Sequence, residues 1–133
     1  MTEAAVVLHL EGGRRHYKPG EILGGEYRLL NLADDDLEAV ELSVLWYTQG
    51  KGDEDLGVHL FTRLSASDGD RLDTRYGGRF STELPNSPLS YDGVLVQIRW
   101  CARVRAFLKG GRELFREEDF HIGAVPAARS VES

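Results

Sequence analysis

Three observations predict that this chain of 133 residues folds as an all-β sandwich of two antiparallel sheets. Apolar and polar residues alternate with a period of two along most segments, as they do in strands that bury one face. Clusters of Gly, Pro, Asp and Ser separate these segments, and about eight strands lie between them. No segment places apolar residues at helical spacing or begins with a capping box, so no helix is expected.

The first strands can be placed from the sequence in order. Val6, Leu8 and Leu10 share one face of a strand near the amino terminus. The next element is a turn over 17–21, where proline presets φ and glycine supplies a left-handed position. A glycine pair at 24–25 then permits a bend before a strand over 26–32.

Two apolar stripes follow, and a polar hairpin loop over 48–55 joins them. A loop over 65–78, rich in Asp, Ser, Gly and Arg, comes next and has little apolar content, which is typical of an exposed connection. A short strand over 79–84 then ends at a proline. The two stripes consist of Val40, Leu42, Val44 and Trp46, and of Val58, Leu60, Thr62 and Leu64.

The second half of the chain is dominated by one long alternating strand over 94–108. Ordinary strands have about 3–10 residues, so this one is expected to bend or to pass between two packing environments. Pro85 and Pro88 precede it, in a rigid segment that we expect to cross between the sheets. A hairpin returns the chain over 112–122, with Phe115, Phe120 and Ile122 as expected anchors. Trp46 and Trp100 are expected at the centre of the core.

Composition limits the classes of function. The net charge of -6 opposes nucleic-acid binding, which needs a basic surface, and no apolar run is long enough for a membrane helix. Cys101 is the single cysteine, so no internal disulfide forms and a cytoplasmic location is expected. We expect one domain over 1–123 and a flexible tail over 124–133.

The order of several short motifs adds a family resemblance. Over 17–122 these motifs together resemble the amino-terminal domain of the arrestin family, especially the α-arrestins and their bacterial relatives. The resemblance implies an immunoglobulin-like, arrestin-like sandwich that binds proteins as an adaptor or scaffold, with no shared catalytic residues. The motifs are Tyr17, Pro19, Gly20, Glu21 and Gly24; Leu37, Glu38, Val40, Glu41 and Leu42; Phe80, Leu84 and Pro85; Pro88, Leu89, Ser90, Tyr91 and Gly93; Ile98, Arg99, Trp100, Arg103 and Val104; and Phe120 and Ile122.

The chain departs from that family in two respects. Family members usually carry two sandwiches, whereas one is expected here, so the two-lobed mechanism would require two chains to associate. The lysine-rich amino-terminal segment of receptor-binding arrestins is also missing. A modest basic cluster, Arg14, Arg15 and Lys18, stands near that place and is a candidate binding site.

The main candidate site is a stripe of arginines on the long strand. Arg99, Arg103 and Arg105 share the face opposite the core. One interpretation is a solvated sheet face, where these arginines pair with Glu38, Glu41, Glu113 or Glu117 across strands. The other is a groove that contacts an acidic partner segment, because a guanidinium suits bidentate contacts with carboxylate or phosphate groups.

Leu45, Tyr47, Leu95 and Phe107 are expected on the same outer face. Burial by loops or strand ends would explain them, and so would a contact with a partner or a second copy. A homo-oligomer through an edge strand or through this face is therefore an open alternative.

Other classes of function are kept as alternatives. A small-ligand or carbohydrate-binding sandwich would stack sugars on Tyr17, Tyr27 or Tyr47. A hydrolase would use Glu83 or Asp92, but no paired-carboxylate signature supports it. Cys101 lacks a histidine at a helpful spacing, and the histidines and the acidic turns match no metal motif, so neither catalysis nor a cofactor is expected.

Overall fold

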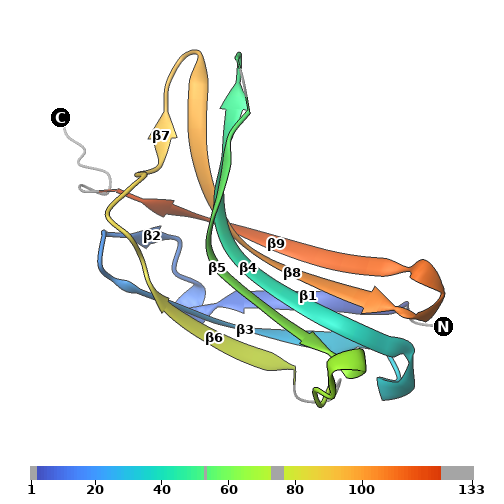
Figure 1. The fold of residues 1–133 in the computed structure, drawn as a ribbon. Coiled ribbons are helices and arrows are strands. Elements are labelled where there is room, and N and C mark those ends of the chain that lie inside the picture. Colours follow the sequence, from blue (N-terminus) through green and yellow to red (C-terminus); the bar gives the residue numbers. More distant parts are fainter. Residues whose placement is uncertain (1–2, 53, 73–76, 124–133) are drawn as a thin grey trace.

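The computed structural model describes residues 3–52, 54–72 and 77–123, which form nine strands and four 3₁₀ turns (Figure 1). The tail expected over 124–133 lies outside the described residues. The strands are β1 (Ala5–Leu10), β2 (His16–Tyr17), β3 (Ile22–Leu30), β4 (Leu37–Gly50), β5 (Leu56–Ser65), β6 (Gly78–Glu83), β7 (Tyr91–Asp92), β8 (Val96–Leu108) and β9 (Glu113–Ile122). The turns are η1 (Glu11–Gly13), η2 (Asp34–Asp36), η3 (Ala66–Asp68) and η4 (Lys109–Gly111).

The strands form two sheets, which confirms the all-β sandwich. The smaller sheet has the order β1-β3-β6, and the larger has the order β2-β9-β8-β4-β5, with β7 also paired to β8. One expectation is wrong in detail, because β2 pairs with β9 in parallel and not antiparallel. This happens because the chain reaches β2 from the smaller sheet and only touches the larger sheet for two residues before it returns to β3.

The core lies between the two sheets and matches the alternation in the sequence. The stripe of β8 supplies Trp100 and Val104, which are 1% and 0% exposed. The Trp100 ring lies 5.9 Å from the Phe120 ring, and Phe120 lies 5.7 Å from the ring of Tyr17. Trp46, expected at the centre, is half-buried and packs against the margin of this core.

The two proline-containing turns meet at one end of the sandwich. The Gly20 N–H donates to the carbonyl oxygen of Leu84 (2.9 Å), and the Leu84 N–H donates to the carbonyl oxygen of Glu21 (2.9 Å). The indole Nε1 of Trp100 donates to the carbonyl oxygen of Pro88 (2.9 Å). These bonds tie the β2–β3 connection and the β6–β7 connection to each other and to the core, and we call them the crossing seam.

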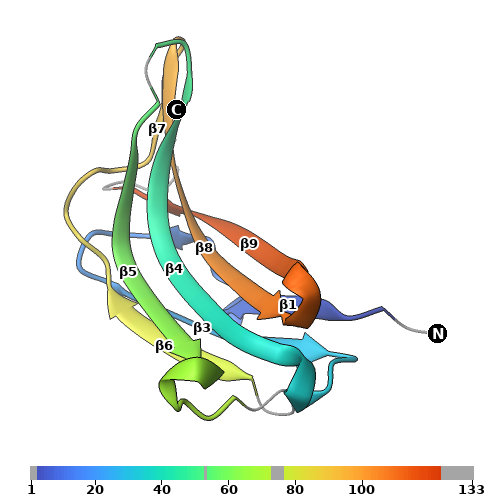
Figure 2. The ribbon, with the colours of Figure 1, turned by 45° about the vertical axis from the view of Figure 1, so that its right-hand side comes forward.

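The long β4 and β8 strands extend past the smaller sheet and form an arm (Figures 1 and 2). They pair along their whole length, from Leu37 opposite Leu108 to Gly50 opposite Val96. β9 leaves β8 after the Trp100–Phe120 pair, and β7 takes its place on the same edge of β8. The arm therefore consists of β7 and the neighbouring parts of β8, β4 and β5.

Two other sequence expectations are wrong. The glycine pair at 24–25 lies inside β3 and not at a bend, because the Phe80 ring crosses Gly25 so closely that a Cβ there would lie 2.5 Å from Cε1 of Phe80. Phe115 was expected in the core but is 62% exposed on the outer face of β9. It stands opposite Arg105, whose side chain also faces away from the core.

Two adjacent residues of β3 test which side of this strand faces the core. Leu23 is 0% exposed, so Leu23→Ala should lower the free energy of unfolding by about 2–5 kcal/mol through lost burial and a residual cavity. Ile22 is 55% exposed, and Ile22→Ala should cost less than about 1 kcal/mol. Urea unfolding followed by fluorescence measures both, and equal losses would contradict the assignment.

Candidate interaction surfaces

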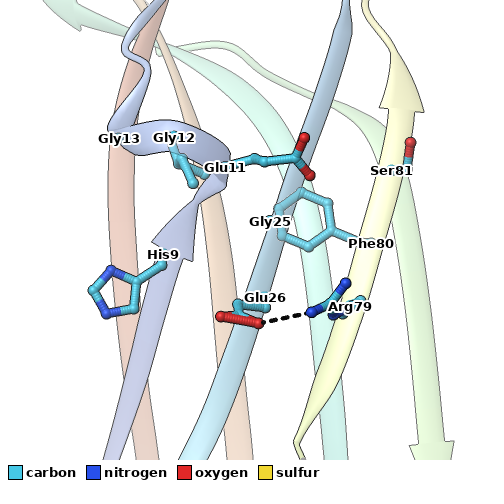
Figure 3. Close-up of a pocket in the computed structure, with 10 residues that line it drawn as sticks. His9, Glu11, Gly12, Gly13, Gly25, Glu26, Arg79, Phe80 and Ser81 are labelled. Carbon is cyan, nitrogen blue, oxygen red and sulfur yellow. Dashed lines mark ion pairs between the residues drawn. The ribbon is translucent and has the colours of Figure 1, made fainter.

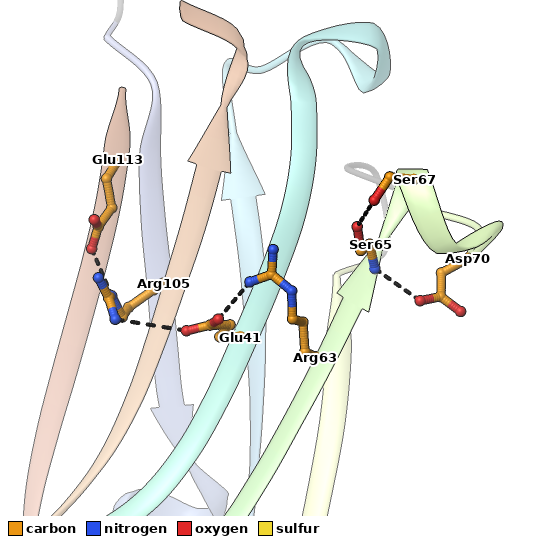
Figure 4. Close-up of polar contacts among 7 residues, drawn as sticks. All are labelled: Glu41, Arg63, Ser65, Ser67, Asp70, Arg105 and Glu113. Atoms are coloured by element: carbon orange, nitrogen blue, oxygen red, sulfur yellow. Dashed lines mark hydrogen bonds and ion pairs between the residues drawn. The ribbon is translucent and has the colours of Figure 1, made fainter. Parts of the chain in front are cut away.

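The outer face of the larger sheet carries a row of paired charges (Figure 4). Arg105 bonds to Glu113 on β9 (2.6 Å) and lies 3.6 Å from Glu41 on β4. The same Glu41 carboxylate accepts a hydrogen bond from Arg63 on β5. The hydrogen bond from Arg105 holds the pKa of Glu113 below its ordinary value, and the same bond raises the pKa of Arg105. The row alternates in charge across four strands, so its groups largely neutralise one another.

The other two arginines of the expected stripe also form ion pairs or hydrogen bonds within the sheet. Arg103 forms an ion pair with Glu117, which is its direct cross-strand neighbour on β9. Arg99 donates to the side-chain oxygens of Gln49 and Gln97, at 2.8 Å each. The structure thus shows the cross-strand pairing for Arg103 and Arg105, while contact of this stripe with an acidic partner stays a prediction.

The second basic cluster lies near the crossing seam. Arg14 forms an ion pair with Glu21, and its guanidinium carbon lies 4.4 Å from the centre of the Tyr17 ring. The backbone N–H of Lys18 and then Arg14 hold the pKa of Glu21 below its ordinary value. Arg15 forms an ion pair with Glu118. These contacts fix the β2 turn, and they leave the Lys18 side chain on the surface.

A cavity of about 450 Å³ brings together one residue of each basic cluster, Arg15 and Arg99. It lies in the fork where β9 and β7 separate along the edge of β8. His16 and His121 line it from the paired β2 and β9, with ring centres 5.5 Å apart. Nδ1 of His121 is buried without a hydrogen-bond partner among the described residues.

Five large apolar side chains of the arm are exposed, and the sequence indicated only part of this set. Exposed fractions are 59% for Leu56, 54% for Val58, 58% for Tyr91, 102% for Val94 and 63% for Leu95. We call these five residues the arm patch. The sequence interpretation included Leu95 but took the position of Val94 as part of a regular strand.

A tight turn presents the tip of the arm patch. The Gly93 N–H donates to the carbonyl oxygen of Val96 (3.0 Å), which leaves Val94 and Leu95 between them. The Lys51 N–H donates to the carbonyl oxygen of Leu95 (2.9 Å) and so joins the β4–β5 loop to this turn. The sequence signal that was available is the Asp-Gly pair before Val94, which commonly marks a hairpin turn.

The other expected apolar residues of the outer face have different environments. Leu45 is 2% exposed and is therefore buried. Tyr47 is half-buried. Phe107 is half-buried beneath the guanidinium groups of Arg63 and Arg105, which lie 5.4 and 5.0 Å from its ring centre. Burial is the correct interpretation for Leu45, and none of these three belongs to the arm patch.

The remaining candidate residues are poorly placed for catalysis or for sugar binding. Burial, followed by the charge of Glu117, raises the pKa of the Cys101 thiol to about 12, so a reactive thiolate is not available. Of the three tyrosines considered for sugar stacking, Tyr17 and Tyr27 are 3% and 8% exposed and so cannot stack, while Tyr47 is half-buried. Glu83 and Asp92 belong to different sheets, on β6 and β7.

Within the described residues, the acidic turns show no assembled metal site. The carboxylate of Asp70 accepts a hydrogen bond from the Ser65 N–H (2.8 Å), which is a structural use of that group (Figure 4). Across residues 3–52, 54–72 and 77–123, no group of three His, Cys, Asp or Glu side chains comes together as metal ligands. In the same residues, no helix is long and apolar enough to cross a membrane.

With this geometry established, the architecture is that of an arrestin-like β-sandwich. A solved structure with this fold is Spo0M, a sporulation control protein from Bacillus subtilis, with a TM-score of 0.65 and 16% sequence identity. The similarity covers 94% of this chain and 51% of that chain, so this chain spans about half the length of its structural neighbour. At this identity the likeness shows the fold alone. No protein-family model and no curated protein matches the sequence.

The charge row predicts a measurable and salt-dependent contribution to stability. Glu41→Gln removes the carboxylate that Arg63 and Arg105 share, and it should lower the free energy of unfolding by about 0.5–1 kcal/mol at low salt. The loss should shrink in 0.5 M salt (about three times physiological ionic strength), because screening weakens exposed pairs. Glu38→Gln, at an exposed neighbouring position that has no ion pair within residues 3–52, 54–72 and 77–123, is the matched control. A loss that is equal in both variants would contradict this role.

The fork predicts a pH dependence of stability. Burial, and then the neighbouring His16, lowers the pKa of His121 below its ordinary value of 6.5. The imidazole of His121 therefore binds a proton more readily in the unfolded chain than in the folded one. The stability that neutral His121 contributes is complete above about pH 6.5, and it is lost as the pH falls through the lowered pKa of the folded state. His121→Gln should reduce the difference in urea midpoint between pH 7.5 and pH 5.5. His9→Gln, at an exposed position, should not, and equal effects of the two would overturn the assignment.

Proposed function

We propose that this chain is a non-catalytic protein-binding module of arrestin-like type, an adaptor or scaffold that holds its partner through the arm patch. The observation that carries the proposal is the concentration of exposed apolar side chains on one projecting element, with Val94 102% exposed at its tip. Exposed apolar groups that gather at one place commonly mark an interface. An arrestin-like fold with a regulatory protein as structural neighbour supports this class of function.

The surroundings of the arm favour contact through side chains over strand addition. β5 is the outer strand of the larger sheet, and its register with β4 shifts between Val44 and Leu45, which leaves His59 as an extra residue. Nε2 of His59 lies 2.9 Å from the carbonyl oxygen of Glu83 on β6 and ties this edge to the smaller sheet. Bulges and covered edges oppose the pairing of an additional strand. A homo-oligomer through the β5 edge is accordingly the weaker alternative.

The proposal has no catalytic step and includes a cytoplasmic location. The high pKa of the buried Cys101 thiol and the separation of Glu83 from Asp92 both favour binding over chemistry. A single buried thiol without a disulfide suits a reducing compartment.

Site-specific photo-crosslinking tests the arm. A photoreactive amino acid at Val94 should give adducts with partner proteins in a lysate of the source cells, identified by mass spectrometry. The same amino acid at Arg112, which lies beside η4 at the other end of β8, should not give them. The double substitution Leu56→Asp and Leu95→Asp should reduce adduct yield at least tenfold, because it places charges in the apolar contact.

The control for folding is the circular dichroism spectrum and the urea midpoint of the double variant, since both substituted residues are exposed. Equal adducts from positions 94 and 112, or adducts that persist in the folded double variant, would refute the arm as the binding element.

A further inference from the structure

A row of exposed apolar side chains runs along β5 on the outer face of the larger sheet. Leu56, Val58 and Phe61 are 59%, 54% and 52% exposed, and we call these three residues the β5 row. Their cross-strand neighbours on β4 share this face, and one of them, Leu45, is buried. Two residues of the row belong to the arm patch, and Phe61 extends the apolar surface past the extra residue His59 towards the body of the sandwich.

The shape of the sheet brings the arm and the body together on this face. The larger sheet bends where the arm begins, and its outer face lies on the inside of the bend (Figures 1 and 2). Leu45 and Cys101, on the outer face at the bend, are 2% and 0% exposed, although none of the described strands packs on this side. One partner segment can therefore cover the β5 row from Leu56 on the arm to Phe61 on the body.

Arg99 lies on the same face, across the sheet from the β5 row. It stands opposite Tyr47 on β4, and Tyr47 stands opposite Leu56, so the three residues form one rung across β8, β4 and β5. Adjacent strands lie about 4.8 Å apart, which places the backbone of Arg99 roughly 10 Å from that of Leu56. A segment that covers Leu56 and Tyr47 therefore reaches Arg99 as well.

Arg99 differs from the other arginines of this face in its partners. The other three, on β5 and β8, each form an ion pair with a glutamate. Arg99 donates to the neutral side-chain oxygens of Gln49 and Gln97, and within residues 3–52, 54–72 and 77–123 it forms no ion pair. The two glutamines orient the guanidinium and leave its charge uncompensated.

Two aspartates on neighbouring strands do not pair with Arg99. Asp92 and Asp119 line the fork, at the edge of β8 where β7 and β9 lie. Nε of Arg99 donates to Gln49 on β4, which is the neighbour of β8 on its other side. The guanidinium is therefore directed towards β4 and the β5 row.

The hollow on the outer face of the smaller sheet lacks this combination of groups (Figure 3). Its volume is about 780 Å³, and its large apolar lining residues, Leu10 and Phe80, are 4% and 9% exposed. Glu26 and Arg79 form an ion pair of 3.6 Å there. Among the residues that line this hollow, a partner would meet neither a large exposed apolar side chain nor an unpaired arginine.

We infer that the partner segment that covers the arm patch carries a carboxylate beside its apolar side chains, and that Arg99 binds this carboxylate. The inference rests on the proposed function, because it names the chemistry of the partner at the same surface. A segment that lies on the β5 row and Tyr47 removes water from Arg99, and a guanidinium that loses water without a counterion is costly. A carboxylate compensates the charge, and its two oxygens match the donor fork of a guanidinium.

The test is a titration of the ¹⁵N-labelled protein with two peptides, followed by NMR at low salt. Acetyl-Glu-Ser-Leu-Ser-Leu-amide places its Glu and both Leu side chains on one face when it is extended, and acetyl-Gln-Ser-Leu-Ser-Leu-amide is the matched neutral probe. The acidic peptide should bind about two- to fivefold more tightly, the range expected for an exposed ion pair. Its saturable shifts should include the amides of 45–47, 56–61 and 97–101.

Three variants separate the charge contact from the apolar contact. Arg99→Gln should abolish the preference for the acidic peptide and leave the affinity for the neutral peptide unchanged. Phe61→Ser should weaken the binding of both peptides to the same extent, because it removes apolar surface and no charge. Arg112→Gln, beside η4 at the other end of β8, is the matched control and should change neither affinity.

The outcomes distinguish this inference from the arm proposal. Equal affinities for the two peptides, or a preference that survives in Arg99→Gln, would refute the carboxylate contact and leave the arm contact standing. No saturable shifts, or shifts confined to other parts of the protein, would overturn the inference as a whole. Photo-crosslinking at Val94 tests the arm without a charged probe, so its result is independent of the peptide preference.

Discussion

The crossing seam is the constraint on which the rest of the structure depends. The chain passes between the two sheets at one end of the sandwich, and two backbone hydrogen bonds join Gly20 and Glu21 to Leu84 there. A third bond joins Trp100 in the core to the carbonyl oxygen of Pro88. The first two bonds continue the β3–β6 pairing beyond Ile22 opposite Glu83, at the point where both segments leave the smaller sheet. The third ties the β6–β7 connection to β8 of the larger sheet, so the three bonds together link the two sheets at that end.

The seam also determines where the arm begins. Because the β6–β7 connection is held against Trp100, β7 joins the edge of β8 that β9 has just left. Beyond that point β4, β5 and β8 have no opposing sheet, and residues on both of their faces are half-exposed or exposed. Apolar side chains there cannot be covered within the described part of the chain. This is the physical reason why the arm patch is exposed, while the apolar residues in the part of β8 that faces the smaller sheet are buried.

Charge is distributed in a different way from exposed apolar area. On the outer face of the larger sheet, Arg103 and Arg105 are balanced by carboxylates on neighbouring strands. Glu11, in η1 beside the smaller sheet, covers the backbone of Gly24 and forms no ion pair among the described residues.

The fold class could be predicted from the sequence, because a period of two indicates which side of each strand is buried. It predicted the core face of β8, the pairing of Arg103 and Arg105 with glutamates as one interpretation, and the return of β9. Which apolar residues stay exposed depends on long-range packing, since Val94 and Val104 are equivalent in the pattern but only Val104 has an opposing sheet. The role of Gly24 and Gly25 depends on long-range packing too, because Glu11 of η1 lies over Gly24 and Phe80 of β6 crosses Gly25. Local patterns specify a face of a strand, and what covers that face depends on segments far away in the chain.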